Sequence, residues 1–178
     1  MSKVVRYTLY AIMFLTIQIL LLNNVTLNST GNNIRPYLYH LFILWLPFAT
    51  KRGTLLWIAF FYGLSFDFFD KTQGLHTMGC LWIAFLRPFF INAVIRQEGQ
   101  EQNFNAPSTQ SFGFGRYTFY IVSLTFLHHF VVLFLTFLQF GHFFSFVFNT
   151  LTFTIISILL IFAIELLISR KDAYRTNT

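Results

Sequence analysis

Six long apolar runs, separated by short polar turns, restrict the folds open to this chain more than any other feature. They cover residues 4–22, 34–50, 53–69, 75–94, 117–140 and 143–169. A helix needs about 20 predominantly apolar residues to cross the roughly 30 Å hydrocarbon core of a bilayer, and most of these runs approach or exceed that length. The sequence therefore predicts an all-α, polytopic membrane protein whose six transmembrane helices form a single domain.

The composition is typical of a membrane-embedded chain. Only 10% of the 178 residues are charged, whereas soluble domains carry about 25%. The single cysteine, Cys80, has no second cysteine with which to form an internal disulfide. A net charge of +6 would suggest a nucleic-acid partner for a soluble domain. Here the basic residues lie between apolar runs, so we expect them to report topology and expect no nucleic-acid partner.

The basic residues predict how the six helices are oriented. Lys and Arg accumulate in the short loops on the cytoplasmic side of a membrane. If the N-terminus lies inside, ten of the 12 basic residues fall on the inner side, and only Arg35 and Lys71 fall on the outer side. We therefore expect both termini inside (N-in, C-in). The segment 95–116, rich in Gln, Asn, Gly and Ser, is then a flexible cytoplasmic loop.

Two aspartates end the third apolar run, where a carboxylate at bilayer depth is expensive. Asp67 and Asp70 are three residues apart and so share one helix face. Gly74 and His76 flank the predicted start of the next helix, whose free backbone N–H groups attract a carboxylate. We expect a structural clamp at this corner, with Gly63 permitting close helix packing. Proton or ion coupling and catalysis remain alternatives.

Four further polar residues interrupt the later runs. His128 and His129 are adjacent on the fifth run, so their side chains diverge by about 100° and cannot face one site together. We expect one of them to form a hydrogen bond within the bundle, and we expect no metal site and no cofactor. Arg87, followed by Pro88, and Glu165 lie at similar depth. They predict either an ion pair or an Arg87 side chain that reaches toward the inner headgroups.

Several short motifs in residues 34–90 carry a resemblance to a known family. They are Ile34-Arg35-Pro36, Leu46-Pro47, Lys51-Arg52-Gly53, Gly63-x3-Asp67-x2-Asp70, Gly74-Leu75-His76 and Leu86-Arg87-Pro88-Phe89. Together they are similar to the MreD family of rod shape-determining proteins, and the His128-His129 pair resembles the Bacteroidota branch of that family. The chain departs from the wider family at Tyr37, where an acidic residue often follows the proline.

The resemblance implies a non-enzymatic scaffold in the inner membrane, within the machinery of cell elongation and peptidoglycan synthesis. It implies MreC as the direct partner. MreB, RodA and the class B penicillin-binding partner of RodA would be reached through the complex, and lipids would surround the chain. The family is also similar in fold to the substrate-binding S subunits of energy-coupling-factor transporters.

That similarity leaves a second function open, an S-type subunit that binds a small molecule such as a vitamin. S subunits resemble one another in a small-xxx-small motif on the first helix. In this chain Ala11 is preceded four residues earlier by Tyr7 and followed four residues later by Leu15, so the motif is absent. A membrane enzyme acting on lipid headgroups is disfavoured, because Asp67 and Asp70 lack the further carboxylates that metal-dependent phosphotransfer needs.

Overall fold

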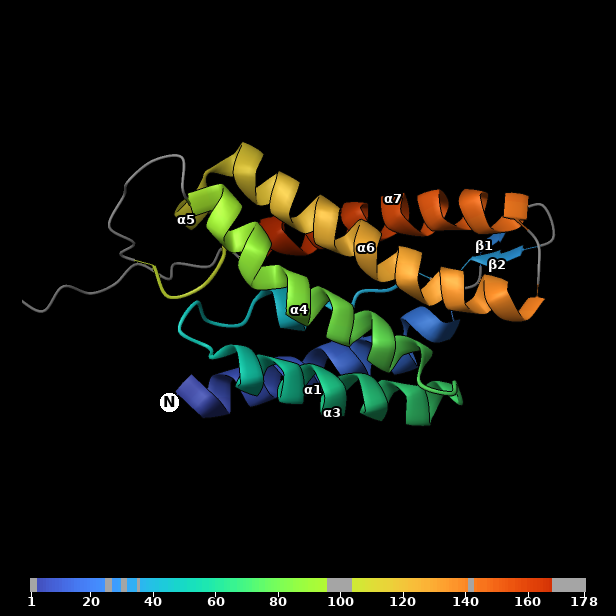
Figure 1. Ribbon diagram of the computed structural model, residues 1–178, viewed down its shortest axis with the longest axis horizontal. Coiled ribbons are helices and arrows are strands. Elements are labelled where there is room, and N and C mark those ends of the chain that lie inside the picture. The colour runs from blue at the N-terminus through green and yellow to red at the C-terminus, as the bar shows by residue number, and fades with distance from the viewer. Residues whose placement is uncertain are drawn as a thin grey trace, which may run out of the picture.

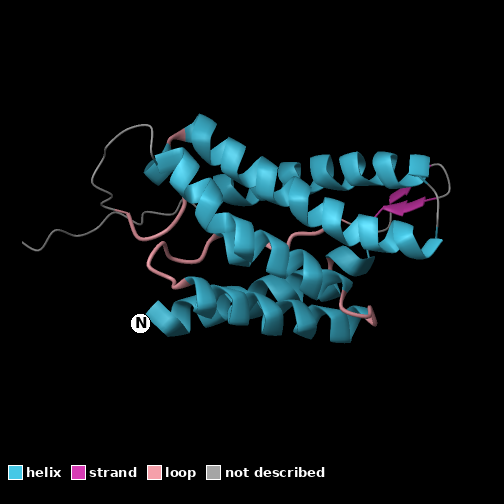
Figure 2. Ribbon diagram, viewed as in Figure 1, coloured by secondary structure: helices cyan, strands magenta, loops and turns pink. Residues whose placement is uncertain are grey.

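The computed structural model describes residues 3–24, 27–29, 32–34, 36–95, 104–140 and 143–167, which are almost entirely helical (Figures 1 and 2). Its long helices are α1 (Lys3–Leu20), α3 (Arg52–Asp70), α4 (Leu75–Ile95), α6 (Phe114–Phe140) and α7 (Phe143–Leu167). Its short elements are the 3₁₀ turn η1 (Leu22–Asn24), α2 (Leu41–Leu44), α5 (Thr109–Phe112) and the antiparallel strands β1 (Leu27–Ser29) and β2 (Asn32–Ile34). Each long helix coincides with a predicted apolar run to within three residues at either end.

Four of the described helices are long and apolar enough to cross a membrane, so the chain is a membrane protein. They cover Val4–Asn24, Leu75–Val94, Phe114–Leu138 and Phe143–Leu167. Helix α3 is long enough, with 19 residues. It is not one of these four because Arg52, Asp67 and Asp70 lower its mean hydropathy.

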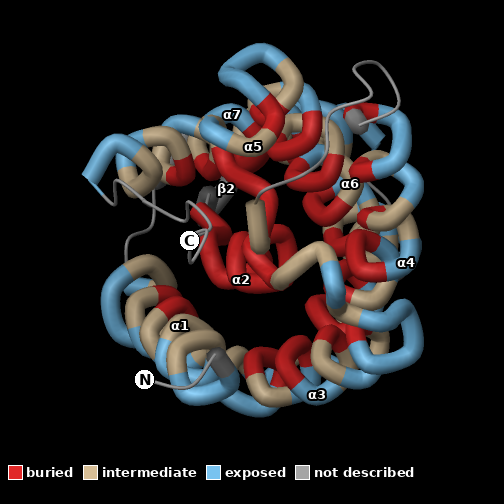
Figure 3. The backbone as a smooth tube through the Cα atoms, turned by 90° about the vertical axis from the view of Figure 1, so that its left-hand side faces the viewer, coloured by how far each residue is buried: buried red, intermediate tan, exposed pale blue. Residues whose placement is uncertain are grey.

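The predicted second transmembrane helix, residues 34–50, is not a helix in the structure. After β2 the chain is extended, turns at Tyr39, forms the single helical turn α2 and leaves it before Pro47. Every residue from Pro36 to Leu46 is buried. We call residues 36–46 the central segment, because the long helices surround it (Figure 3).

The elements of the bundle run between two ends (Figure 1). One end holds the N-terminus, the turn before α3 and α5, and we call it the basic end because Arg6, Lys51, Arg52 and Arg116 belong to the elements there. The other end holds β1, β2, the α3–α4 corner, the end of α6 and the start of α7, and we call it the hairpin end.

Part of the predicted flexible loop 95–116 has defined secondary structure. Ile95 ends α4, and Ser108 caps α5 by accepting a hydrogen bond from the Ser111 N–H at 3.1 Å. The Ser111 hydroxyl oxygen accepts from the Ser108 N–H at 2.8 Å, which completes a capping box. Phe112 is buried. Residues 96–103 lie outside the described residues.

Candidate functional site: a polar network around the central segment

Most backbone N–H and C=O groups of the central segment lie outside a helix and need partners elsewhere in the bundle. A chain in a bilayer must satisfy its backbone N–H and C=O groups, and outside helices and closed barrels this happens only where the backbone is buried in protein. An unpaired backbone group buried away from water costs about 1–3 kcal/mol. The partners of the central segment therefore decide how the bundle is held together.

Gln18 on α1 bonds three backbone groups at the start of the segment. Its side-chain oxygen accepts from the N–H groups of Leu38 at 2.7 Å and Tyr39 at 3.3 Å. Its side-chain NH₂ donates to the carbonyl of Pro36 at 3.0 Å. A single side-chain amide thus bonds three backbone groups that a helix would have bonded internally.

Two hydroxyl groups from other helices bond the same stretch. The Tyr37 N–H donates to the Ser157 hydroxyl oxygen of α7 at 3.1 Å. The Tyr62 hydroxyl of α3 donates to the Tyr39 carbonyl at 3.0 Å. The extended part of the segment is therefore bonded from three sides.

The far half of the segment is bonded from α4 and α6. The Tyr120 hydroxyl donates to the Leu44 carbonyl at 2.9 Å. Arg87 donates from Nη2 to the Leu46 carbonyl and from Nε to the Tyr120 hydroxyl, at 3.0 Å in the second case. Arg87 is buried, so it does not reach toward the headgroups.

The other alternative, an Arg87–Glu165 ion pair, is replaced by two separate contacts. Arg87 bonds Tyr120 and the central segment, whereas Glu165 accepts a hydrogen bond from the Tyr117 hydroxyl. The Trp45 indole N–H donates to that same hydroxyl at 3.1 Å. The tyrosines on α6 are the partners of both side chains, and similar depth in the sequence did not reveal them.

Each of the five long helices thus contributes one polar side chain to the backbone of the central segment. They are Gln18, Tyr62, Arg87, Tyr120 and Ser157. Because these bonds come from all sides, they join the ring of helices through its centre.

A tyrosine of the central segment joins two histidines. The Tyr39 hydroxyl lies 2.8 Å from Nδ1 of His76 on α4 and 2.7 Å from Nε2 of His128 on α6. A phenol carries one proton, so it donates to one ring and accepts from the other. Nε2 of His76 lies 3.6 Å from the Asp70 carboxylate, which extends the connection to α3.

His129 forms its own pair of bonds, but its ring lies 5.3 Å from that of His128 and both rings contact His40, so the prediction that the two histidines cannot face one site was wrong. Nδ1 of His129 lies 2.8 Å from the carbonyl of Thr125, which only accepts, so Nδ1 carries the proton. Its Nε2 then accepts from the Ser157 hydroxyl at 3.2 Å. Both adjacent histidines, rather than one, are therefore bonded within the bundle, and each bonds a different element.

His40 completes the cluster by stacking. Its ring lies 4.5 Å from that of His128 with an interplanar angle of 14°, and its Nε2 lies 3.2 Å from the Thr125 hydroxyl oxygen. The Nδ1 atoms of His40 and His128 are buried without a hydrogen-bond partner among the described residues. Within that part of the chain no three His, Cys, Asp or Glu side chains are arranged to hold a metal ion.

Asp67 lies at the start of α4. One carboxylate oxygen accepts from the Thr72 hydroxyl at 2.5 Å and from the His76 N–H at 3.0 Å. The other accepts from the N–H and the hydroxyl of Thr77 at 2.8 and 2.5 Å. Four donors, two of them backbone groups of the first helical turn, offset the burial of this charge.

Asp70, one turn later, lies near the His76 ring of α4 and also bonds the turn η1 that follows α1. The Asn23 side-chain NH₂ donates to Asp70 at 3.0 Å, and Gln18 in turn donates to the Asn23 oxygen at 3.1 Å. The two aspartates therefore meet at His76, whose N–H donates to Asp67 and whose ring lies beside Asp70, while Asp70 alone extends to Asn23.

The glycines and prolines of the predicted site have structural places. A Cβ on Gly63 would lie 2.6 Å from the Thr77 Cα, so its absence lets α3 approach α4 closely. Gly74 has a φ of +83° in the corner before α4. Pro36 begins the central segment, and Pro88 lies inside α4. Arg35 lies outside the described residues.

Sequence reasoning missed most of the neutral polar residues of the network. They are Gln18, Tyr39, Tyr62, Tyr120 and Ser157, together with Gly79, whose Cβ would lie 3.0 Å from the ring of His128. Tyr and Ser are common in membrane helices, and only ionisable side chains mark a position as expensive. The best available signal was Gln18, an amide in an otherwise apolar run.

Comparison of the chain with protein-family models, with curated proteins and with solved structures finds no match.

Proposed function

We propose that this chain is a non-enzymatic scaffold of the bacterial inner membrane that resembles the MreD family and docks MreC within the cell-elongation machinery. The observation that carries the proposal is where the family-like motif residues lie. Gly63 and Asp67 join α3 to α4, and Arg87 bonds the central segment. Their chemistry is used inside the bundle, as expected of a protein that works through its shape.

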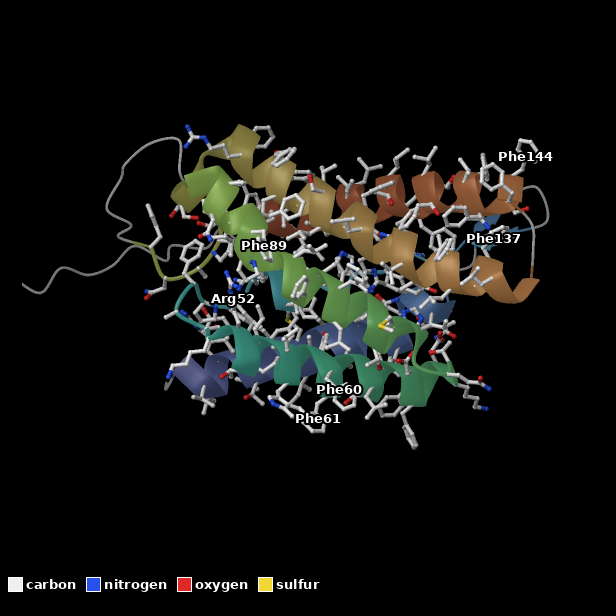
Figure 4. The ribbon with its side chains drawn as sticks, in the orientation of Figure 1. Arg52, Phe60, Phe61, Phe89, Phe137 and Phe144 are labelled. Atoms are coloured by element: carbon white, nitrogen blue, oxygen red, sulfur yellow. The ribbon has the colours of Figure 1, made fainter. Side chains whose placement is uncertain are left out.

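The outer surface supports a role in assembly within the membrane. Large apolar side chains are exposed on all five long helices, including Leu9 on α1, Phe85 on α4 and Phe126 on α6. Phe61 on α3 and Phe144 at the start of α7 are labelled in Figure 4. Such a surface fits lipid tails and also the apolar transmembrane helix of a partner.

In this proposal the basic end faces the cytoplasm and the chain passes the membrane six times. The central segment makes the second pass, between the hairpin end and the basic end. Arg6, Lys51, Arg52 and Arg116 at one end, against Lys71 at the α3–α4 corner, give the charge bias that sets orientation.

The alternative is an S-type subunit that binds a small molecule, with the fold of the energy-coupling-factor transporters. Its support is the non-helical central segment, because transporters place binding sites at interrupted helices. In this chain the backbone groups at Leu38, Tyr39 and Leu44 are already bonded by side chains. Saturable binding of a vitamin by the purified chain would favour this alternative.

The test of the scaffold is co-purification. Tagged chain is co-expressed with MreC and purified in mild detergent, and we expect MreC to be retained in a fixed ratio. Loss of MreC from a chain that remains monodisperse would remove the main support for the proposal.

Photo-crosslinking then locates the docking face. A crosslinking residue is introduced at exposed positions of each helix, such as Leu9, Phe61 and Leu151, with the buried Ile83 and Leu124 as matched controls. We expect crosslinks to MreC to gather on one helix face. Equal crosslinking around the whole bundle would indicate random encounter instead of docking.

A further inference from the structure

A cavity of about 580 Å³ opens at the basic end between α1, the end of the central segment and α3. Its volume lies within the range of about 300–1,000 Å³ that is usual for small-ligand sites. Asn105 also lines it, and the Phe48 N–H donates to the Asn105 carbonyl at 3.0 Å. This bond fixes the segment before α5 beside the cavity.

The lining of the cavity is divided by chemistry. Phe42, Leu46 and Ile58 supply an apolar floor that reaches into the bundle. Arg6 and Lys51 supply two positive charges, accompanied by the hydroxyl-bearing residues Thr8, Thr50 and Thr54. An apolar floor with a cationic rim matches an amphiphile whose head is anionic.

Two features add to the cationic rim, one by orienting Arg6 and one by adding positive charge beside Lys51. The Arg6 guanidinium carbon lies 5.3 Å from the centre of the Tyr7 ring, a cation–π contact that orients the side chain. Lys51 is the N-cap residue of α3, and no side chain caps that helix start. The N-terminal end of α3 therefore adds its own partial positive charge beside Lys51.

We propose that this cavity binds the phosphate of an anionic phospholipid, with the start of an acyl chain on the apolar floor. The cavity lies where α1 and α3 begin, at an end of the bundle, and lipid phosphates lie at that depth in a bilayer. Basic pockets between helices at the cytoplasmic face are typical binding sites of anionic headgroups. A free phosphate ion would use the rim and leave Phe42, Leu46 and Ile58 without a role.

The test is lipid titration of the full-length chain in neutral detergent, followed by native mass spectrometry. Phosphatidylglycerol, phosphatidylcholine and inorganic phosphate are compared as probes. We expect one phosphatidylglycerol per chain, bound at least about tenfold more tightly than phosphatidylcholine, because each basic residue adds roughly fivefold. We expect millimolar inorganic phosphate not to displace it.

Matched variants assign the binding to this cavity. The double variant Arg6→Gln, Lys51→Gln should weaken phosphatidylglycerol binding by about 30-fold. Arg52→Gln removes the same charge one residue from Lys51, but Arg52 points to the ring of Phe89, 5.3 Å away and outside the cavity (Figure 4). We expect Arg52→Gln to leave the affinity unchanged, and equal losses in both variants would overturn the proposal in favour of general charge attraction.

A third variant tests the apolar floor without changing the charge. Ile58→Trp adds side-chain volume to the cavity and should abolish phosphatidylglycerol binding while circular dichroism remains that of the wild type. Unchanged lipid binding in Ile58→Trp would overturn the acyl-chain part of the proposal. Displacement of the lipid by inorganic phosphate at equal concentration would show a phosphate site instead of a lipid site.

Discussion

At the scale of single residues, the buried carboxylate of Asp67 shows how a charge is kept inside this bundle. Its two oxygens accept four hydrogen bonds at 2.5–3.0 Å, all from the α3–α4 corner or the first turn of α4. The sequence predicted a structural clamp at this corner and left ion coupling and catalysis as alternatives. The donors to Asp67 indicate that it joins two helices.

Asp67→Asn should destabilise the fold without preventing membrane insertion. The amide NH₂ would face backbone donors at one of the two oxygen positions, and an unsatisfied buried group costs about 1–3 kcal/mol. Thermal unfolding in detergent measures the loss. Ser65→Ala is the matched control, since the Ser65 hydroxyl bonds only the Phe61 carbonyl one turn earlier. Equal stability of Asp67→Asn and Ser65→Ala would contradict the clamp.

Tyr39→Phe should destabilise the bundle through the histidines. The change removes the hydroxyl that bonds both His76 and His128 and leaves two buried ring nitrogens unpaired. We expect a loss of about 1–3 kcal/mol, measured by the same unfolding assay. Tyr10→Phe is the control, because the Tyr10 ring packs edge-on against the Trp45 ring and the change keeps that ring contact. A Tyr39→Phe variant as stable as the control would show that the Tyr39 hydroxyl does not stabilise the bundle.

At the scale of elements, the sequence predicted the long helices well and the second apolar run badly. Hydropathy reports that a segment avoids water, and residues 36–46 do so as completely as any helix of the bundle. It does not report where the backbone hydrogen bonds go. Those bonds come from Gln18 and Ser157 on helices far away in sequence, so local pattern could not reveal them.

The candidate site shows the same division. Asp67, His76 and His128 stood out because ionisable groups in apolar runs are expensive, and all three are buried in the structure. Tyr39 and Tyr62 did not stand out, since a tyrosine in a membrane helix is equally typical of an interfacial anchor. The partner of a polar group depends on tertiary structure, which periodicity does not encode.

Gly63→Ala tests the contact between α3 and α4. The added Cβ would lie 2.6 Å from the Thr77 Cα, a backbone atom that moves only if the helices separate. Overpacking of this kind costs about 1–3 kcal/mol. Gly53→Ala on the same helix meets nothing within 4 Å and should be neutral or stabilising. Thermal unfolding of the two variants side by side decides, and equal melting would contradict close packing at Gly63.

At the scale of the whole molecule, five long helices enclose a segment that is neither helix nor strand over most of its length (Figure 3). Soluble proteins can leave such a segment to water, but a bilayer cannot hydrate it. Side chains of the surrounding helices therefore supply the hydrogen-bond partners that water would supply to this backbone. Removal of one side-chain donor or acceptor should therefore destabilise mainly the backbone group that it bonds.

Orientation in the membrane is testable on the same scale. In a Cys80→Ser background, a single cysteine replaces the exposed Gln73 at the hairpin end or the exposed Ala49 at the basic end. We expect a membrane-impermeant maleimide to label Gln73→Cys from the periplasm and to label Ala49→Cys only after the inner membrane is opened. The reverse pattern would invert the proposed topology.

Amide hydrogen exchange, resolved by residue, tests most directly that the surrounding helices hold the central segment. In the wild-type chain we expect the N–H groups of Tyr37, Leu38 and Tyr39 to be protected as strongly as those of α4. Gln18→Leu removes the acceptor of Leu38 and Tyr39 but not that of Tyr37, which bonds Ser157. Exchange should rise by about 5- to 100-fold at Leu38 and Tyr39 alone. Rapid exchange throughout the wild-type segment, or an equal rise at all three residues, would contradict this architecture.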